Sequence, residues 1–186
     1  MTSRQTPRTD PPRFRGIRTY RDPLGRFSLR HPSDWHRAEL ADGRDGVFLS
    51  PEAHECGTHA ALWVAPLDVH VVAEDLEVLS AGVEKGMSGL SDLTVTASHD
   101  GVYGNLLKLE RCYTFSQDGA VRQRRAWTLY VDTWQFVLLW QGRTPEDYYY
   151  WLPMANYVFT SFELPESLWF ATDRDLAGPS GAPVAP

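Results

Sequence analysis

Hydrophobic and polar residues alternate along most of this chain, a pattern typical of strands that bury one face. A clear example is the row Trp134, Phe136, Leu138 and Trp140. About eight segments have a strand-like pattern, and they span residues 26–30, 36–40, 47–50, 59–67, 93–99, 105–115, 120–131 and 134–141. Turn residues such as Asp118 and Gly119 separate the later segments, which predicts an antiparallel meander over that part of the chain.

Two segments instead repeat their apolar residues every three or four positions, as helices packed on a sheet do. The first spans residues 73–90, and its apolar stripe is Leu76, Leu79, Val83, Met87 and Leu90. The second is expected from Thr144, which can cap the helix before Pro145, to about Thr160. Its expected stripe is Tyr148, Trp151, Leu152, Ala155 and Val158 or Phe159. Strands and helices in this order predict an α+β fold.

Composition sets the expected boundaries of the domain. A hydrophobic content of 42%, with seven Trp, eight Tyr and eight Phe, indicates a packed core. The first 18 residues hold five arginines and one aspartate, so they carry +4 and the rest of the chain −10 of the net charge of −6. We predict a disordered basic arm over residues 1–18, one domain over residues 19–165 and a tail over residues 166–186 that ends in a segment rich in Gly, Pro and Ala.

Charge and cysteine count limit the partners and the location that we expect. An acidic body disfavours nucleic acid as the partner. No run of about 18 apolar residues is present, so we expect no membrane span. The N-terminal residues lack the apolar core of a secretory signal, which predicts a cytoplasmic protein. We also expect no cofactor. Cys56 and Cys112 are too few for a disulfide framework, although one bridge between them remains open.

The opening of the predicted domain resembles that of a known superfamily. The matching residues are Tyr20, Asp22, Gly25, Arg26, Phe27, Ser28 and Leu29, followed by Pro32, Ser33, Asp34 and Trp35. They are similar to the start of the PsbP-like superfamily, which includes the photosystem II extrinsic subunit and the Ran-binding Mog proteins. The resemblance covers most of residues 19–165 and implies an α/β/α sandwich with a central, mostly antiparallel sheet and two main helices. It also implies that the fold usually binds other proteins and is seldom catalytic.

The loop from His54 to His59 is the best candidate for a metal site, because His54, Cys56 and His59 are possible zinc ligands close together in the chain. The spacing matches no closed zinc motif, and no second pair of ligands at short spacing is present, so we expect no metal. The sequence also lacks the Gly-x-Ser-x-Gly context of a serine nucleophile and a glycine loop that would bind phosphate. We therefore predict no catalytic residue.

Arg111 is a candidate ligand-binding residue. It interrupts the otherwise apolar face Leu107, Leu109, Tyr113 and Phe115 of a predicted strand. A buried guanidinium must either pair with a carboxylate at the edge of the core or line a cleft that receives an anion. The second possibility leaves open a small-anion-binding protein or an enzyme, with a site around Arg111 and the His54–His59 loop.

The aromatic run from Tyr148 to Trp151 points to a different function. A helix can turn only some of four consecutive aromatic residues inward, so Tyr149 and Tyr150 should stand near the surface, where aromatic side chains favour contact with partners. Trp169 can extend the same surface. We therefore predict a non-catalytic protein-binding or adaptor domain that uses Tyr149, Tyr150 and Trp169 to contact another protein or a second copy of itself.

Overall fold

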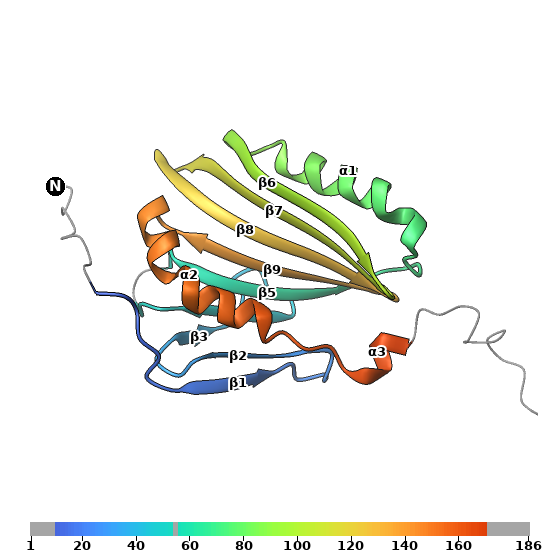
Figure 1. Ribbon diagram of the computed structural model, residues 1–186, viewed down its shortest axis with the longest axis horizontal. Coiled ribbons are helices and arrows are strands. Elements are labelled where there is room, and N and C mark those ends of the chain that lie inside the picture. Colours follow the sequence, from blue (N-terminus) through green and yellow to red (C-terminus); the bar gives the residue numbers. More distant parts are fainter. Residues whose placement is uncertain (1–9, 54–55, 171–186) are drawn as a thin grey trace, which may run out of the picture.

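The computed structural model describes residues 10–53 and 56–170, apart from the side chains of residues 169 and 170. Within these residues nine strands form two sheets (Figure 1). The strands are β1 (Ile17–Arg21), β2 (Ser28–Pro32), β3 (His36–Ala38), β4 (Gly46–Ser50), β5 (His59–Pro66), β6 (Ser91–Tyr103), β7 (Leu106–Gln117), β8 (Ala120–Val131) and β9 (Trp134–Gly142). The helices are the short 3-10 helix η1 (Ala73–Asp75), α1 (Leu76–Met87), α2 (Pro145–Thr160) and α3 (Glu166–Phe170).

The main sheet has seven strands in the order β3-β4-β5-β9-β8-β7-β6, and every neighbouring pair is antiparallel. Strands β6 to β9 form the predicted meander. Asp118 and Gly119 both have positive φ, 52° and 72°, because the two-residue turn between β7 and β8 requires a left-handed backbone. Strands β1 and β2 pair only with each other in a separate hairpin.

One face of the main sheet is covered by α2 and by the β1–β2 hairpin, and we call it the covered face (Figure 1). Its core combines aliphatic residues with pairs of aromatic rings. The indole of Trp35 stacks on that of Trp140 with ring centroids 5.8 Å apart, and Phe27 meets Phe136 edge-on at 6.1 Å. The helix can begin directly over the end of β9 because Gly142 has no side chain, since a Cβ there would lie 2.4 Å from the backbone nitrogen of Tyr148.

The opposite face, which we call the open face, carries α1. Leu76, Leu79 and Val83 pack against the cluster of Leu107, Leu109 and Tyr130, and Met87 packs with Tyr113 and Phe115. The predicted stripe of the first helix is therefore confirmed. In the described part of the chain α1 packs against β6, β7 and β8, so β4, β5 and β9 have no helix above them on this side (Figure 1).

The predicted fold class is confirmed. A seven-stranded antiparallel sheet lies between α2 on one face and α1 on the other, which is the α/β/α sandwich that the resemblance implied. The longest described helix, α2, has 16 residues and runs through Pro153 without a break. No described helix combines the length and the apolar character that crossing a bilayer would require.

The predicted boundaries need correction at both ends. Strand β1 begins at Ile17, so residues 17 and 18 belong to the folded domain and not to the arm. Phe14 lies still earlier, and its ring meets that of Tyr157 with centroids 5.2 Å apart. At the other end α3 follows Pro165 and occupies residues 166–170. The rest of the predicted arm and tail, residues 1–9 and 171–186, lies outside the described residues.

Candidate functional site

The open face is hollowed beside α1 into a groove of about 340 Å³, which we call the open groove. Val137 and Leu139 of β9 line it together with Ala126 of β8, and Trp63 stands on β5 directly beside Val137. Val137 and Leu139 are only 9% and 8% exposed, although no described helix covers them. The groove thus has an apolar floor, and its volume is at the lower end of the range for ligand sites in proteins.

The wall that α1 contributes to the groove contains Gly82. A Cβ atom at this position would meet nothing within 4 Å, so the missing side chain leaves room in the groove. Gly86, one turn later, is equally unobstructed but does not line the groove. A glycine inside a helix costs about 1 kcal/mol relative to alanine. The width of the open groove therefore depends on a residue that weakens the helix beside it.

Polar side chains at the rim of the open groove are paired with each other. Arg124 donates from Nε to Oε1 of Gln141 at 3.0 Å, and its guanidinium lies 4.5 Å from the ring centroid of Phe115. Gln135 donates to the hydroxyl of Tyr130 at 2.9 Å. Among the described residues that line the groove there is no carboxylate, histidine or cysteine. The groove can bind apolar groups and offer hydrogen bonds, but it presents no acid–base pair.

The predicted candidate Arg111 is 2% exposed, and its charge is compensated within the fold. Its guanidinium forms two hydrogen bonds to the Asp100 carboxylate, one of them at 3.0 Å, and donates to the Ser80 hydroxyl at 2.7 Å. Glu84 lies 3.5 Å away. The hydrogen bond from Arg111 lowers the pKa of Asp100. This group, which we call the arginine clamp, joins α1 to β6 and β7 and leaves Arg111 little capacity to receive an anion.

The loop with the candidate metal ligands can be followed only in part, because His54 and Glu55 lie outside the described residues. Cys56 is an exposed free thiol. Nδ1 of His59 contacts the carbonyl oxygen of Cys56 at 2.7 Å, and the ring stacks on Phe48 with centroids 4.6 Å apart. Burial lowers the pKa of His59 to about 4, so the ring is neutral at physiological pH. No cluster of three or more metal-ligating side chains occurs within residues 10–53 and 56–170.

Arg111 and His59 do not share a pocket in the described part of the chain. Arg111 lies across from Ala126, which pairs with Leu139, which in turn pairs with Ala61 of β5. Three strand spacings, about 14 Å, therefore separate Arg111 from the strand that carries His59. The site that the sequence left open, with both residues around one ligand, is not assembled by these elements.

The predicted aromatic contact residues lie on or after α2. Tyr149 is 61% exposed, and its hydroxyl accepts a hydrogen bond from Nε2 of Gln123 at 3.0 Å. Tyr150 is half-buried, and its ring meets Trp151 edge-on with centroids 4.9 Å apart. Trp169 belongs to α3, but its side chain lies outside the described structure. Tyr149 is therefore the exposed aromatic residue of this run.

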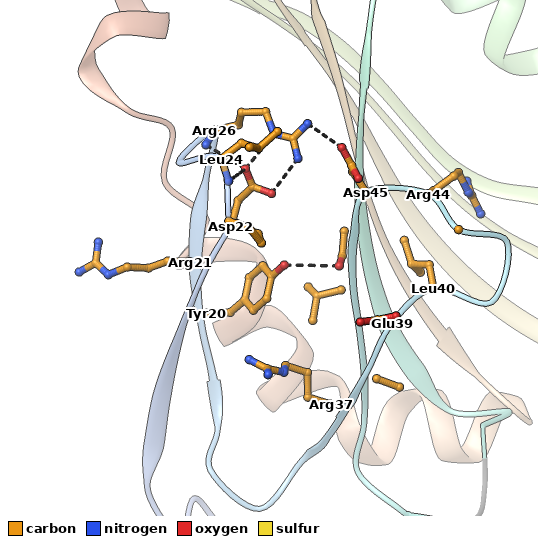
Figure 2. A pocket seen from close by; sticks show the side chains of 15 residues that line it. Tyr20, Arg21, Asp22, Leu24, Arg26, Arg37, Glu39, Leu40, Arg44 and Asp45 are labelled. Atoms are coloured by element: carbon orange, nitrogen blue, oxygen red, sulfur yellow. Dashed lines mark hydrogen bonds and ion pairs between the residues drawn. The ribbon is translucent and has the colours of Figure 1, made fainter.

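A further cavity, of about 810 Å³, lies between the β1–β2 turn and the segment that joins β3 to β4, and we call it the hairpin cleft (Figure 2). Figure 2 shows Arg26 reaching from the hairpin to two carboxylates, Asp22 at 2.8 Å and Asp45 at 3.0 Å. Burial alone would raise the pKa of Asp22, but hydrogen bonds from Arg26 and from the Leu24 N–H lower it below its ordinary value. This ionic bridge ties the hairpin to the main sheet.

An adjoining cavity of about 540 Å³ shares Arg37 with the hairpin cleft, and we call it the arginine pocket. Arg18 of β1, His31 of β2 and Arg37 of β3 line it. Sequence reasoning missed both cavities, because Arg18 was assigned to the arm and Arg37 stands in a short exposed strand without a distinctive pattern. The signal that was available is the turn-forming run Asp22, Pro23, Leu24 and Gly25, because the hairpin that it closes brings Arg18 opposite His31.

Comparison with known proteins gives the fold. No protein-family model and no curated protein matches this chain. The solved structure of CyanoP, the PsbP protein of a Synechocystis cyanobacterium, matches with a TM-score of 0.60 at 12% identity, over 80% of this chain and 92% of that one.

Two further solved structures match at similar levels. LpqN of Mycobacterium tuberculosis, which is involved in cell envelope biogenesis, matches with a TM-score of 0.55 at 12% identity, over 80% of this chain and 92% of that one. The Ran-binding protein Mog1p of Saccharomyces cerevisiae matches with a TM-score of 0.53 at 8% identity, over 84% of this chain and 99% of that one. At these identities the matches show the fold alone, and this chain has the PsbP/Mog-type fold that its opening residues resemble.

Proposed function

We propose that this chain is a non-catalytic binding domain that holds a partner protein against the open groove. The observation that carries the proposal is the apolar floor of Val137 and Leu139 on β9, which no described helix covers, continued by Ala126 at the edge of α1. When a partner displaces water from apolar side chains, the complex is stabilised by about 25 cal/mol for each Å² of apolar surface that becomes buried. The absence of carboxylate, histidine and cysteine from the described lining favours binding over catalysis.

A polypeptide is the occupant that the groove fits best. The groove is flanked by α1 on one side and Trp63 on the other, and it is large enough to hold a few side chains of a partner. Thr128 and Gln135 stand on the same face of the sheet, and the Thr128 hydroxyl and the amide oxygen of Gln135 can form hydrogen bonds with a backbone laid along β9. The Ran-binding activity of Mog1p is a precedent for protein recognition by this fold.

The test blocks the groove without touching the core. Gly82→Leu places a side chain in the groove, and Gly86→Leu places the same side chain on the same helix outside it. Tagged full-length wild type and both variants are used to capture proteins from the native lysate, and each captured protein is then measured for affinity. We expect a partner that Gly86→Leu retains and that Gly82→Leu binds at least about tenfold more weakly. Equal binding by the two variants, or no protein retained by the wild type, contradicts the proposal.

The aromatic residues on α2 are a second candidate contact, favoured by the 61% exposure of Tyr149. Interface energy is concentrated in a few Tyr, Trp and Arg residues, so Tyr149→Ala with Tyr150→Ala should weaken binding by about 2 kcal/mol if α2 carries the contact. The same capture experiment separates the two surfaces. A partner lost with this double variant but retained by Gly82→Leu would move the interface to α2, and a thermal melt of the double variant shows whether the fold is intact.

A further inference from the structure

Two exposed arginines of this protein, Arg18 and Arg37, line one cavity and form no ion pair with the described residues there. Ion pairs with carboxylates are formed by Arg26, Arg44, Arg111, Arg125 and Arg143. Arg18 and Arg37 have no carboxylate partner among the described residues. Both line the arginine pocket, where the one carboxylate in the described lining, Asp34, lies 3.9 Å from Arg15. Two guanidinium groups without compensation at one cavity are a feature that folding alone does not require.

The two arginines reach the pocket from different sheets. Arg18 stands directly opposite His31 in the β1–β2 hairpin, on the side where Tyr20 and Leu29 are buried against the main sheet. Arg37 comes from β3, and Figure 2 shows its side chain extending toward β1, with the guanidinium carbon 5.9 Å from the ring centroid of Tyr20. The fold therefore brings the two side chains to the same space from opposite walls.

His31 gives the pocket a buried polar wall. It is 5% exposed, and its Nδ1–H donates to the carbonyl oxygen of Pro32 at 2.8 Å. This bond fixes the ring, and the second ring nitrogen, Nε2, has no hydrogen-bond partner among the described residues. Unlike Nε1 of Trp35, this atom is not sealed from solvent, and in the neutral ring it can accept a hydrogen bond from the hydroxyl of a hydrogen phosphate group. Arg18, Arg37 and His31 thus line one polar cavity.

We propose that the arginine pocket binds an oxyanion of the phosphate class, either inorganic phosphate or the phosphate group of a phosphomonoester. The planar guanidinium of each arginine can form two parallel hydrogen bonds to phosphate oxygens. The hydroxyl of Ser33, which also lines the pocket, can add a donor. The pocket of about 540 Å³ has room for a group attached to the phosphate. This site is separate from the open groove, which lies on the other face of the sheet.

Calorimetric titration of the full chain with inorganic phosphate and with phenyl phosphate, at low ionic strength, tests the proposal. Arg37→Gln and Arg18→Gln each remove one guanidinium from the pocket. Arg30→Gln is the matched control, because Arg30 neighbours His31 on β2 but is absent from the lining and faces Glu163 at 3.6 Å. We expect each pocket variant to bind at least about tenfold more weakly than wild type, since a hydrogen bond to a charged group is worth about 1.5–3 kcal/mol. The control should stay within about twofold of wild type.

Each outcome decides a point. Phenyl phosphate bound at least about tenfold more tightly than inorganic phosphate indicates an organic phosphomonoester as the ligand class, and similar affinities indicate free phosphate. No binding of either probe by the wild type overturns the proposal. An equal loss in Arg30→Gln also overturns it, because that result would show a response to net charge alone. A thermal melt without anion confirms that each variant is folded.

The ring of His31 supplies an independent readout. Burial, with a smaller contribution from Arg18 and Arg37, lowers its pKa below the ordinary value of 6.5. A bound anion opposes that effect, so adding sulfate should raise the pKa of His31 as measured from its ring proton signals in NMR spectra. Asp34 and His36 also line the pocket, so their signals should change together with those of His31, whereas the signals of His99, on β6 and outside the lining, follow any general effect of salt. A pKa of His31 that does not change at a saturating anion concentration would place the anion elsewhere and refute the site.

Discussion

The two faces of the main sheet use the same strand for different purposes. On the covered face β9 presents Phe136, Leu138 and Trp140, which are enclosed by α2 and the hairpin. On the open face the intervening residues Val137 and Leu139 are almost as little exposed, yet no described helix lies above them. The first set is buried by contact with other elements, and the second is sheltered in a hollow. Low exposure therefore has two physical causes in one strand, and only the first contributes fully to stability.

The helices on the two faces are also held differently. Five buried residues of α2 pack it against the sheet: Tyr148, Met154, Ala155, Val158 and Phe159. Of α1 only Met87 is fully buried, and the arginine clamp adds a polar attachment. An apolar attachment is insensitive to salt and pH, whereas a polar one responds to both. We therefore expect α1, and with it the open groove, to respond to solution conditions more than α2 does.

The largest expected effect compares two adjacent leucines. Leu138→Ala leaves a cavity in the covered core and should lower the free energy of unfolding by about 3 kcal/mol or more. Leu139→Ala removes a side chain at the edge of a hollow that solvent can enter, so we expect a loss of about 2 kcal/mol, the transfer free energy without the cavity contribution. Urea unfolding of both variants measures the difference. Equal losses would mean that the open face is covered as completely as the other.

A smaller effect is expected from the arginine clamp. Asp100→Asn removes the charge that compensates the buried Arg111 and should destabilise the protein by about 2 kcal/mol at pH 7, reduced from the value for fully buried pairs because Asp100 is partly exposed. The pKa of Asp100 is lower in the folded protein than its ordinary value of 3.8. Its stabilising contribution is therefore complete above the unfolded pKa and is lost as the pH falls through the lower, folded pKa.

Unfolding curves between pH 7 and acid conditions check this prediction. The difference between wild type and Asp100→Asn should shrink as the pH falls below about 4, because protonation then removes the same charge from the wild type. Arg30→Gln is the control, since it breaks an exposed ion pair that is worth less than about 1 kcal/mol. A difference that stays constant down to acid pH would show that the charge of Asp100 does not contribute.

Most of the fold could be predicted from the sequence, because each buried strand face leaves a period of two and each packed helix face a period near 3.6. The exceptions have physical reasons. In β1 only Tyr20 is buried, so the strand shows no clear alternation of apolar and polar residues. In α2 the predicted stripe omitted Met154, which is 1% exposed, and included Trp151 and Leu152, which are only partly buried. Local periodicity cannot show how a helix rotates once it meets a particular sheet.

The candidate sites were harder to predict than the fold. The row Gln135, Val137, Leu139 and Gln141 has the same alternation whether or not a helix covers it, so the open groove has no sequence signature. The arginine pocket requires two sheets to face each other, and nothing local to Arg18 or Arg37 encodes that arrangement. Arg111 was identified, but its partners Asp100 and Ser80 come from β6 and α1. The cytoplasmic location, the protein partner and the contact role of Tyr149, Tyr150 and Trp169 stay predictions.

The smallest expected effect concerns stability at the two glycines of α1. Gly82→Leu and Gly86→Leu should each raise the free energy of unfolding by about 0.5–1 kcal/mol, because leucine favours the helix and neither position meets an atom within 4 Å of its new Cβ. Gly82→Leu should add up to about 1 kcal/mol more, since its side chain can cover part of the apolar floor of the open groove. Chemical denaturation of the two variants measures this difference directly. A gain that is the same at both positions would show that the leucine at position 82 stays in solvent, so the groove would be too wide or too wet for a single apolar side chain to close it. A loss at position 82 alone would show that the groove is already occupied by residues of this chain, and the comparison between a covered and an open face would then fail.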